Sequence, residues 1–175
     1  MDPLLTETCV CPTCRGDLNW SSTRATCHAC GQSFPIVDGI PVFALLHDDD
    51  HKRGQAELFF DAVSEDWEIE RPWGGAALYG WLISEKLRRS VAGIEDRLPG
   101  STTLVACAGS GMDAEFLARA GARVVASDVS LGAALRARER GRRHGVPIVP
   151  LVADAESLPF RDQGVDLTYV HDGLH

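Results

Sequence analysis

The sequence lacks any apolar run that approaches the length of a membrane-spanning helix, which needs about 20 residues. It also lacks an N-terminal stretch in which a charged segment is followed by an apolar one, the pattern of a secretory signal peptide. There is no internal repeat and no low-complexity tract. These absences predict a protein that acts in the cytoplasm, without a membrane partner.

Positive charge is scarce as well. Lys and Arg total 17 against 25 for Asp and Glu, which gives a net charge of −8. An acidic balance disfavours non-specific attraction to nucleic-acid phosphates, although a local basic face is compatible with it. With 175 residues and 45% hydrophobic composition, the chain can bury one ordinary core and carry a small appendage, so we expect one or two domains.

Four of the six cysteines form two CxxC pairs near the start of the chain: Cys11, Cys14, Cys27 and Cys30. Each pair places two thiolates on one tight turn, and four sulfurs complete the tetrahedral coordination of a structural Zn²⁺, leaving no position for a catalytic water. Disulfides and free thiols are the alternatives, and a reducing cytosol disfavours disulfides. Cys9 is predicted to be a bystander or a substitute ligand.

The surrounding stretch, residues 8–43, is too short to be held together by apolar burial alone. Metal binding, worth about 10–16 kcal/mol in small zinc modules, would supply most of its folding energy. Asp38-Gly39 lies between two short apolar runs and predicts a hairpin.

The CPTC and CHACG knuckles and the tail FPIVDGIP occur together in this stretch. This combination resembles the zinc ribbon of the small methyltransferase-activator proteins, and also the ribbons fused ahead of some bacterial methyltransferases. The resemblance implies a zinc ribbon over residues 1–46, through which a protein partner could bind.

Residues 47–100 are interpreted as a linker followed by N-terminal helices. The polar segment 47–53 is the predicted linker, and apolar residues at helical spacing predict helices over 55–63 and 75–97. Three tryptophans cluster near the break between these helices: Trp67, Trp73 and Trp81. Packing of the helices onto a sheet is the preferred interpretation of them, and lining of a substrate pocket is the alternative.

From residue 101 to residue 175, short apolar runs alternate with helical segments. Strands are predicted over 102–106, 123–126, 148–152 and 165–170, and helices over 113–120 and 131–144. Such alternation is typical of the α/β class, with a Rossmann-like parallel sheet and right-handed crossovers.

Three features at the predicted strand ends indicate a binding site. Gly109 and Gly111 lie in a small-residue turn that enters a helix, where a ligand can approach free backbone N–H groups closely. Asp128 ends the second strand, where a carboxylate can accept from both ribose hydroxyls of an adenosine ligand, and Asp154 follows the third, where it can accept from an adenine amino group. A purely structural turn and a helix cap at Asp128 are the alternatives.

Residues 102–175, and above all the stretch DAESLPF with the fourth-strand motif after it, resemble the class I S-adenosylmethionine-dependent methyltransferases that act on small molecules. The resemblance implies that Ala108, Gly109 and Gly111 hold the methionine part of S-adenosylmethionine. By the same resemblance, the remaining cofactor contacts are Asp128 at the ribose, Val129 beside it, Asp154 and Ala155 at the adenine, and His171 near the transferred methyl group.

Two positions depart from the family pattern, because Val105 stands where the family has an acidic residue and Cys107 where it has the first loop glycine. The chain also stops within the fourth-strand motif, where the family continues through three further strands, so we expect a sheet truncated after its fourth strand and a longer parent protein.

His171 and His175 are the candidate bases for an acceptor that must lose a proton.

The sequence therefore predicts methyl transfer to an unidentified acceptor, with a small molecule favoured over RNA. The fingerprint GxGxxA in the loop, followed by Asp128, also fits an NAD-dependent oxidoreductase. A non-enzymatic zinc-ribbon module that binds a partner or RNA is the other alternative. For that alternative the candidate surface is the run of arginines on the helix predicted over 131–144, which contains Arg136, Arg138, Arg140, Arg142 and Arg143. A solvated face is the commoner explanation of such a run.

Overall fold

The computed structural model describes residues 1–44, 50–57, 65–171 and 173. Its N-terminal part consists of a short helix and four antiparallel strands in the order β1-β2-β3-β4. These elements are α1 (Pro3–Thr8), β1 (Leu18–Trp20), β2 (Arg24–Cys27), β3 (Ser33–Val37) and β4 (Ile40–Pro41). The predicted hairpin is confirmed, because Val37 pairs with Ile40 across Asp38 and Gly39, which both have positive φ angles.

The middle of the chain differs from its prediction in several places. Its described elements are α2 (Asp50–Glu57), α3 (Glu65–Glu70), α4 (Ala77–Ser90) and the short 3₁₀ helix η2 (Glu95–Arg97). The predicted linker 47–53 is wrong where α2 begins at Asp50, and the predicted helix 55–63 lies largely outside the described residues. The helix predicted over 75–97 ends at Ser90, and Gly93 with a φ of +85° follows, a backbone angle that a right-handed helix does not contain.

The prediction that the three tryptophans pack into the core is wrong. Trp67, Trp73 and Trp81 are 62%, 44% and 61% exposed. Trp73 has a packing partner, because its ring stacks on Phe116 with centroids 5.4 Å apart.

The C-terminal part is a parallel sheet of four strands in the order β7-β6-β5-β8. Its elements are β5 (Thr102–Ala106), α5 (Met112–Arg119), β6 (Arg123–Asp128), α6 (Leu131–His144), β7 (Ile148–Val152) and β8 (Leu167–Val170). The predicted Rossmann-like α/β architecture is confirmed, with boundaries shifted by one or two residues at several ends. Because all four strands are parallel, their carboxyl ends meet at one edge of the sheet.

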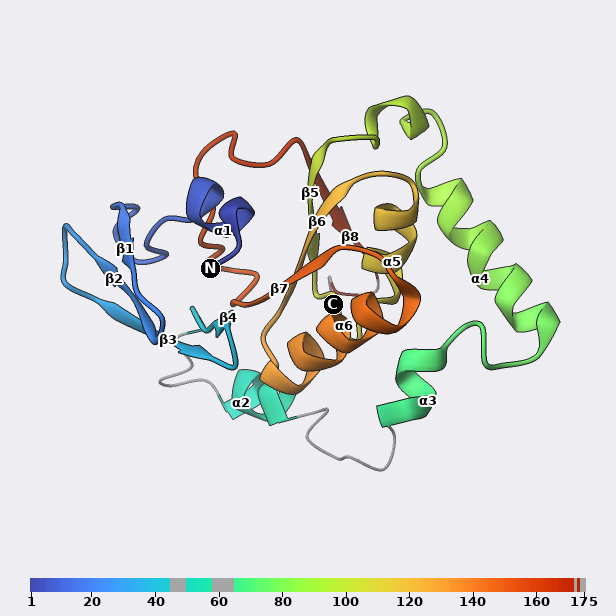
Figure 1. Ribbon diagram of the computed structural model, residues 1–175, viewed down its shortest axis with the longest axis horizontal. Coiled ribbons are helices and arrows are strands. Elements are labelled where there is room, and N and C mark those ends of the chain that lie inside the picture. Colours follow the sequence, from blue (N-terminus) through green and yellow to red (C-terminus); the bar gives the residue numbers. More distant parts are fainter. Residues whose placement is uncertain (45–49, 58–64, 172, 174–175) are drawn as a thin grey trace.

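The two faces of this sheet are covered by different parts of the chain (Figure 1). Helices α5 and α6 cover the face that carries Val105, Val124 and Ala126. The opposite face, with Leu104, Val125 and Leu151, packs against α1 and the small N-terminal sheet in one continuous core. The N-terminal unit therefore takes the place of a helical layer on that side of the sheet.

Backbone contacts join the two units at β7 and at the loop after it. The N–H of Phe43 donates to the carbonyl of Val152 at 2.7 Å, and Val42 forms an isolated parallel bridge with the same residue. Farther along, Cys9 bridges Phe160. The N-terminal unit thus occupies the edge of β7 next to its carboxyl end, where the strand would otherwise present unpaired backbone groups.

None of the helices in the described ranges combines the length and the apolar character that a membrane crossing requires.

Candidate cofactor site and cysteine cluster

The four predicted metal ligands are brought together by the first two strands and the turns beside them. The sulfurs of Cys11, Cys14, Cys27 and Cys30 all lie within 4.8 Å of one another. Cys11 Sγ is 3.8 Å from Cys30 Sγ and Cys14 Sγ is 3.4 Å from Cys27 Sγ. A tetrahedral ion with Zn–S bonds of about 2.3 Å sets sulfurs about 3.8 Å apart, so the cluster fits Zn²⁺.

Hydrogen bonds within this cluster shift the pKa values of its thiols in opposite directions. At Cys14 the backbone N–H of Gly16 favours the thiolate, but the sulfurs of the other three cysteines and burial outweigh it and raise the pKa to about 12. Backbone N–H groups of Cys30 and Ala29 hydrogen bond to the Cys27 sulfur and lower the pKa of this thiol to about 6. Cys9 is buried outside the cluster, where it follows α1, so it is a bystander and not a substitute ligand. Desolvation by burial raises the pKa of the Cys9 thiol to about 12, which keeps it neutral.

The glycine loop leaves β5 and enters α5 at the carboxyl edge. Ala108 donates its N–H to the carbonyl of Ser127 at the end of the neighbouring strand, 3.0 Å away. Gly109 has a φ of +52°, and a Cβ added there would meet nothing within 4 Å, so the backbone borders open space. Gly111 has a φ of +79° and precedes α5, and a Cβ there would come within 2.9 Å of Ala137 on α6. The first glycine leaves room for a ligand, whereas the second allows close helix packing.

Asp128 lies at the end of β6 and reaches toward this loop. Its carboxylate accepts the N–H of Gly109 at 2.8 Å and that of Ser130 at 3.0 Å. Desolvation by burial raises the pKa of Asp128, and backbone N–H groups, first that of Ser130, act against this rise. A buried carboxylate beside an open glycine loop is an acceptor suited to a pair of ribose hydroxyls.

Asp154 follows β7, the strand next to β6, so both predicted carboxylates are at the same edge of the sheet. One carboxylate oxygen of Asp154 accepts the N–H of Glu156 at 3.0 Å, and the other accepts from Lys52 Nζ of α2 at 2.6 Å. Lys52 also contacts Glu156 Oε2 at 2.7 Å, and these hydrogen bonds, with that of Asp154 the largest, raise the pKa of Lys52. Ala155 is exposed beside them.

An apolar cavity of about 230 Å³ lies beside Val129, the residue after Asp128. Its walls come from three parts of the chain: Val42 and Ala44 after β4, Arg53, Ala56 and Glu57 of α2, and Val129, Leu131 and Val152 at the sheet edge. The N-terminal unit and α2 therefore reach the neighbourhood of the predicted adenine contacts.

His171 follows β8 and completes the set at the carboxyl edge. Its Nδ1 lies 3.0 Å from Oδ2 of Asp113, which is in the first turn of α5. The side chains of both residues are largely buried, with 21% and 13% exposed. The other histidine candidate, His175, lies outside the described residues.

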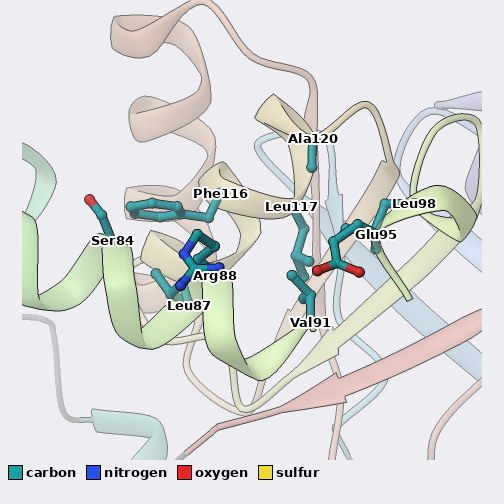
Figure 2. Close-up of a pocket in the computed structure, with 9 residues that line it drawn as sticks. All are labelled: Ser84, Leu87, Arg88, Val91, Glu95, Leu98, Phe116, Leu117 and Ala120. Atoms are coloured by element: carbon teal, nitrogen blue, oxygen red, sulfur yellow. The ribbon is translucent and has the colours of Figure 1, made fainter. Parts of the chain in front are cut away.

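A second, larger cavity of about 290 Å³ is separate from this edge. Figure 2 shows that it lies between α4 and α5, lined by residues such as Leu87, Val91 and Phe116. The cavity lies toward the amino ends of the strands, because its lining includes Leu98, which precedes β5, and Ala120, which follows α5. This cavity therefore contains none of the predicted cofactor contacts.

The arginine run on α6 does not form a basic surface. Arg136 and Arg140 are 2% and 0% exposed, and Arg142 and Arg143 both bind Glu139 of the same helix. The interpretation of the run as one solvated face is wrong, because alternate arginines turn into the protein.

Comparison with known proteins agrees with this geometry. Residues 104–175 match a family described as "Methyltransferase domain", and residues 2–39 match a family described as "Trm112p-like protein". The chain is 36% identical over 122 residues to a demethylmenaquinone methyltransferase of Corynebacterium urealyticum, an alignment that covers 69% of this chain and 47% of that protein. It is 41% identical over 54 residues to a UPF0434 protein of Methylobacillus flagellatus, covering 30% of this chain and 87% of that protein.

The solved structure of magnesium protoporphyrin IX methyltransferase from Synechocystis PCC 6803, which contains bound SAH, superposes with a TM-score of 0.54 at 19% identity. The superposition covers 71% of this chain and 59% of that one, and it shows a shared fold. The chain spans about half the length of the methyltransferase relatives that it matches. The chain therefore combines a domain that is similar to methyltransferase domains with an N-terminal segment that is similar to Trm112p-like proteins and contains the four-cysteine cluster.

Proposed function

We propose that the protein binds S-adenosylmethionine at the carboxyl edge of its parallel sheet and transfers the methyl group to a small molecule. The observation that carries this proposal is the hydrogen bond from the open glycine loop to Asp128 at the end of β6, with Asp154 just after the adjacent parallel strand at the same edge of the sheet. In the proposed site, Ala108, Gly109 and Gly111 hold the methionine part. Asp128 and Val129 hold the ribose side, and Asp154 and Ala155 hold the adenine.

S-adenosylmethionine supplies the activated methyl group when it is bound. The chain contributes position, and orientation of two reactants is worth about 7–11 kcal/mol of an activation barrier. His171 is the proposed base for an acceptor that must lose a proton. In the tautomer that has its hydrogen on Nδ1, His171 donates to Oδ2 of Asp113, and Nε2 is then the basic nitrogen proposed to take the proton of the acceptor.

A small molecule is the proposed acceptor, because no continuous basic strip runs along α6 in the described chain and the net charge is −8. The name of the relatives makes demethylmenaquinone the first acceptor to test. The proposed role of the cysteine cluster is to bind one Zn²⁺ that stabilises the ribbon without taking part in catalysis.

Ligand binding tests the cofactor assignment. We expect S-adenosylmethionine to raise the melting temperature of the protein in a thermal-shift experiment and NAD to leave it unchanged. Asp128→Asn removes an anionic acceptor and is expected to weaken S-adenosylmethionine binding by about tenfold or more in calorimetry. Protection by NAD alone would overturn the proposal in favour of an oxidoreductase.

The pH dependence of binding gives a second readout at Asp128. The ribose hydroxyls donate to the ionised carboxylate, so binding weakens as the pH falls through the pKa of Asp128. Because burial raises this pKa, the loss of affinity is expected to begin at a higher pH than it would for an ordinary aspartate. An affinity that does not change on acidification while the protein stays folded would argue against Asp128 as the ribose acceptor.

A further inference from the structure

Arg140 on α6 holds the glycine loop from inside the protein. Its guanidinium is completely buried, and its Nε donates to the backbone carbonyl of Ser110, the residue between the two loop glycines, at 2.9 Å. One turn earlier on α6, Ala137 lies against Gly111 so closely that a Cβ at this glycine would be 2.9 Å from the alanine Cβ. The loop therefore rests on α6 at two successive residues.

The charge of Arg140 is balanced by Glu115 on α5. Arg140 Nη1 lies 2.9 Å from Glu115 Oε2, and both side chains are 0% exposed. Trp73 Nε1 and Arg119 Nε donate to the other oxygen of Glu115, at 3.0 and 2.8 Å. The same Nη1 also donates to the backbone carbonyl of Arg71, in the segment before α4. One planar guanidinium thus joins α6, α5, the glycine loop and the connection after α3.

Such a pair is a costly way to stabilise a protein. The desolvation of two buried charges can exceed their attraction, and well-packed apolar residues often serve stability as well. A guanidinium can fix the positions of the groups around it, because its N–H donors point in set directions toward their acceptors. An apolar residue has no such donors. In this chain one of these acceptors belongs to the proposed cofactor loop.

We propose that Arg140 is a positioning residue that sets the glycine loop in the geometry required by the methionine part of the cofactor. This inference rests on the proposed function, because it gives a role to a residue behind the same site. The hydrogen bond of Arg140 to the cofactor site is made to the loop at Ser110, so we expect its effect at the end of the ligand that the loop holds. Loss of Arg140 is expected to weaken binding of the amino-acid end and to leave binding of the adenosine end nearly unchanged.

Two ligands separate these ends. S-adenosylhomocysteine carries the amino-acid tail, whereas 5′-methylthioadenosine has the same nucleoside without it. For Arg140→Met in the complete chain, calorimetry is expected to show a loss of about tenfold in affinity for S-adenosylhomocysteine, the size of a lost hydrogen bond to a charged group. The affinity for 5′-methylthioadenosine is expected to change by less than about twofold.

Two further variants keep the test independent of folding. Arg140→Met combined with Glu115→Leu replaces the buried pair by apolar residues of similar size and leaves no unpaired carboxylate. It is expected to show the same selective loss. Arg142→Met removes an arginine of the same helix that pairs with Glu139 at the surface, and it is the matched control that should leave both affinities unchanged.

The outcomes distinguish this inference from the proposed function. If the wild-type protein binds neither ligand, the proposed function fails. If the wild type binds both and the Arg140 variants lose both affinities equally, or neither, the positioning role is rejected and Arg140 is purely structural. If neither Arg140 variant folds, Arg140 is required for the fold, and the positioning role is rejected as well.

Discussion

At the scale of single residues, Cys107 has a backbone angle that its residue type disfavours. It is the first residue of the loop after β5, and its φ of +53° lies in the left-handed region that favours glycine. Its thiol lies near the carbonyl of Gly173, with Sγ 3.6 Å from the oxygen. The resemblance to the methyltransferase family assigns a glycine to this position, so the chain retains the family backbone with a side chain that strains it.

Two substitutions at Cys107 separate the backbone from the thiol. Cys107→Gly and Cys107→Ala both remove the sulfur, but only glycine relieves the left-handed strain. We expect the glycine variant to be more stable than the alanine variant by about 1 kcal/mol, the lower end of the cost of a left-handed residue. Chemical denaturation of both variants measures this difference. Equal stabilities would mean that the backbone at Cys107 relaxes without cost.

The placements that the sequence predicted correctly depend on short-range patterns. The CxxC spacing identified the four clustered cysteines, and the ends of apolar runs placed Asp128 and Asp154 at one edge. The contacts of Lys52, Asp113 and Arg140 could not be found in this way, because each of them joins residues that are far apart in the sequence. Lys52 is 102 residues from Asp154, and no local pattern records that pairing.

At the scale of elements, α2 is the segment that the sequence described least well. The polar residues before it suggested a linker, whereas the chain is helical from Asp50 to Glu57. Its stability comes from outside the helix, through the ion pairs of Lys52 with Asp154 and Glu156 and through contacts with α6. Local propensity misses such a helix because tertiary contacts override it.

The position of Lys52 predicts competition with the cofactor. Its ammonium group lies on the Asp154 oxygen that does not accept the Glu156 N–H, and an adenine amino group would need an acceptor there. Lys52→Met is therefore expected to tighten S-adenosylmethionine binding by roughly two- to fivefold, the range of a partly exposed ion pair. Calorimetry measures the change, and Arg89→Met, which removes an exposed arginine of α4 that pairs with Glu85, serves as the control.

Salt offers a second check on the same contact. Added salt weakens the pair between Lys52 and Asp154, so the affinity of the wild type should approach that of Lys52→Met as the ionic strength rises. Weaker cofactor binding in Lys52→Met would show instead that α2 forms a required wall of the adenine site.

At the scale of the whole molecule, the arrangement of the two units is what the sequence could not reveal. The two CxxC pairs predicted a ribbon and the alternating pattern predicted a sheet, but neither indicates that one covers the other. The joint core brings Phe34 and Phe43 of the ribbon together with Leu104 and Val125 of the sheet. Side-chain contacts over such separations depend on the folded arrangement of both units, and periodicity within each unit contains no record of them.

This shared core predicts that the metal in the ribbon supports the cofactor site. Removing the proposed Zn²⁺ is expected to unfold the ribbon, because metal binding supplies most of the folding energy of such small modules, and to expose the sheet face that carries Leu104, Val125 and Leu151. Val42 and Ala44, which line the cavity beside Val129, lose their support in the same step. We therefore expect chelation to lower both the melting temperature and the affinity for S-adenosylhomocysteine, and added Zn²⁺ to restore both.

A pair of cysteine variants makes this prediction specific to the cluster. Cys14→Ser removes an exposed ligand and should reproduce the effect of chelation, whereas Cys107→Ser removes a cysteine outside the cluster and should bind Zn²⁺ as the wild type does. Scanning calorimetry and ligand titration on the same samples measure the melting temperature and the affinity for S-adenosylhomocysteine.

If the metal-free protein kept its affinity while the ribbon alone unfolded, the parallel sheet would be stable without the ribbon packed on it. The ribbon would then have to act on something other than the cofactor site. Loss of both together would instead show that the zinc ribbon is a structural layer of the methyltransferase domain.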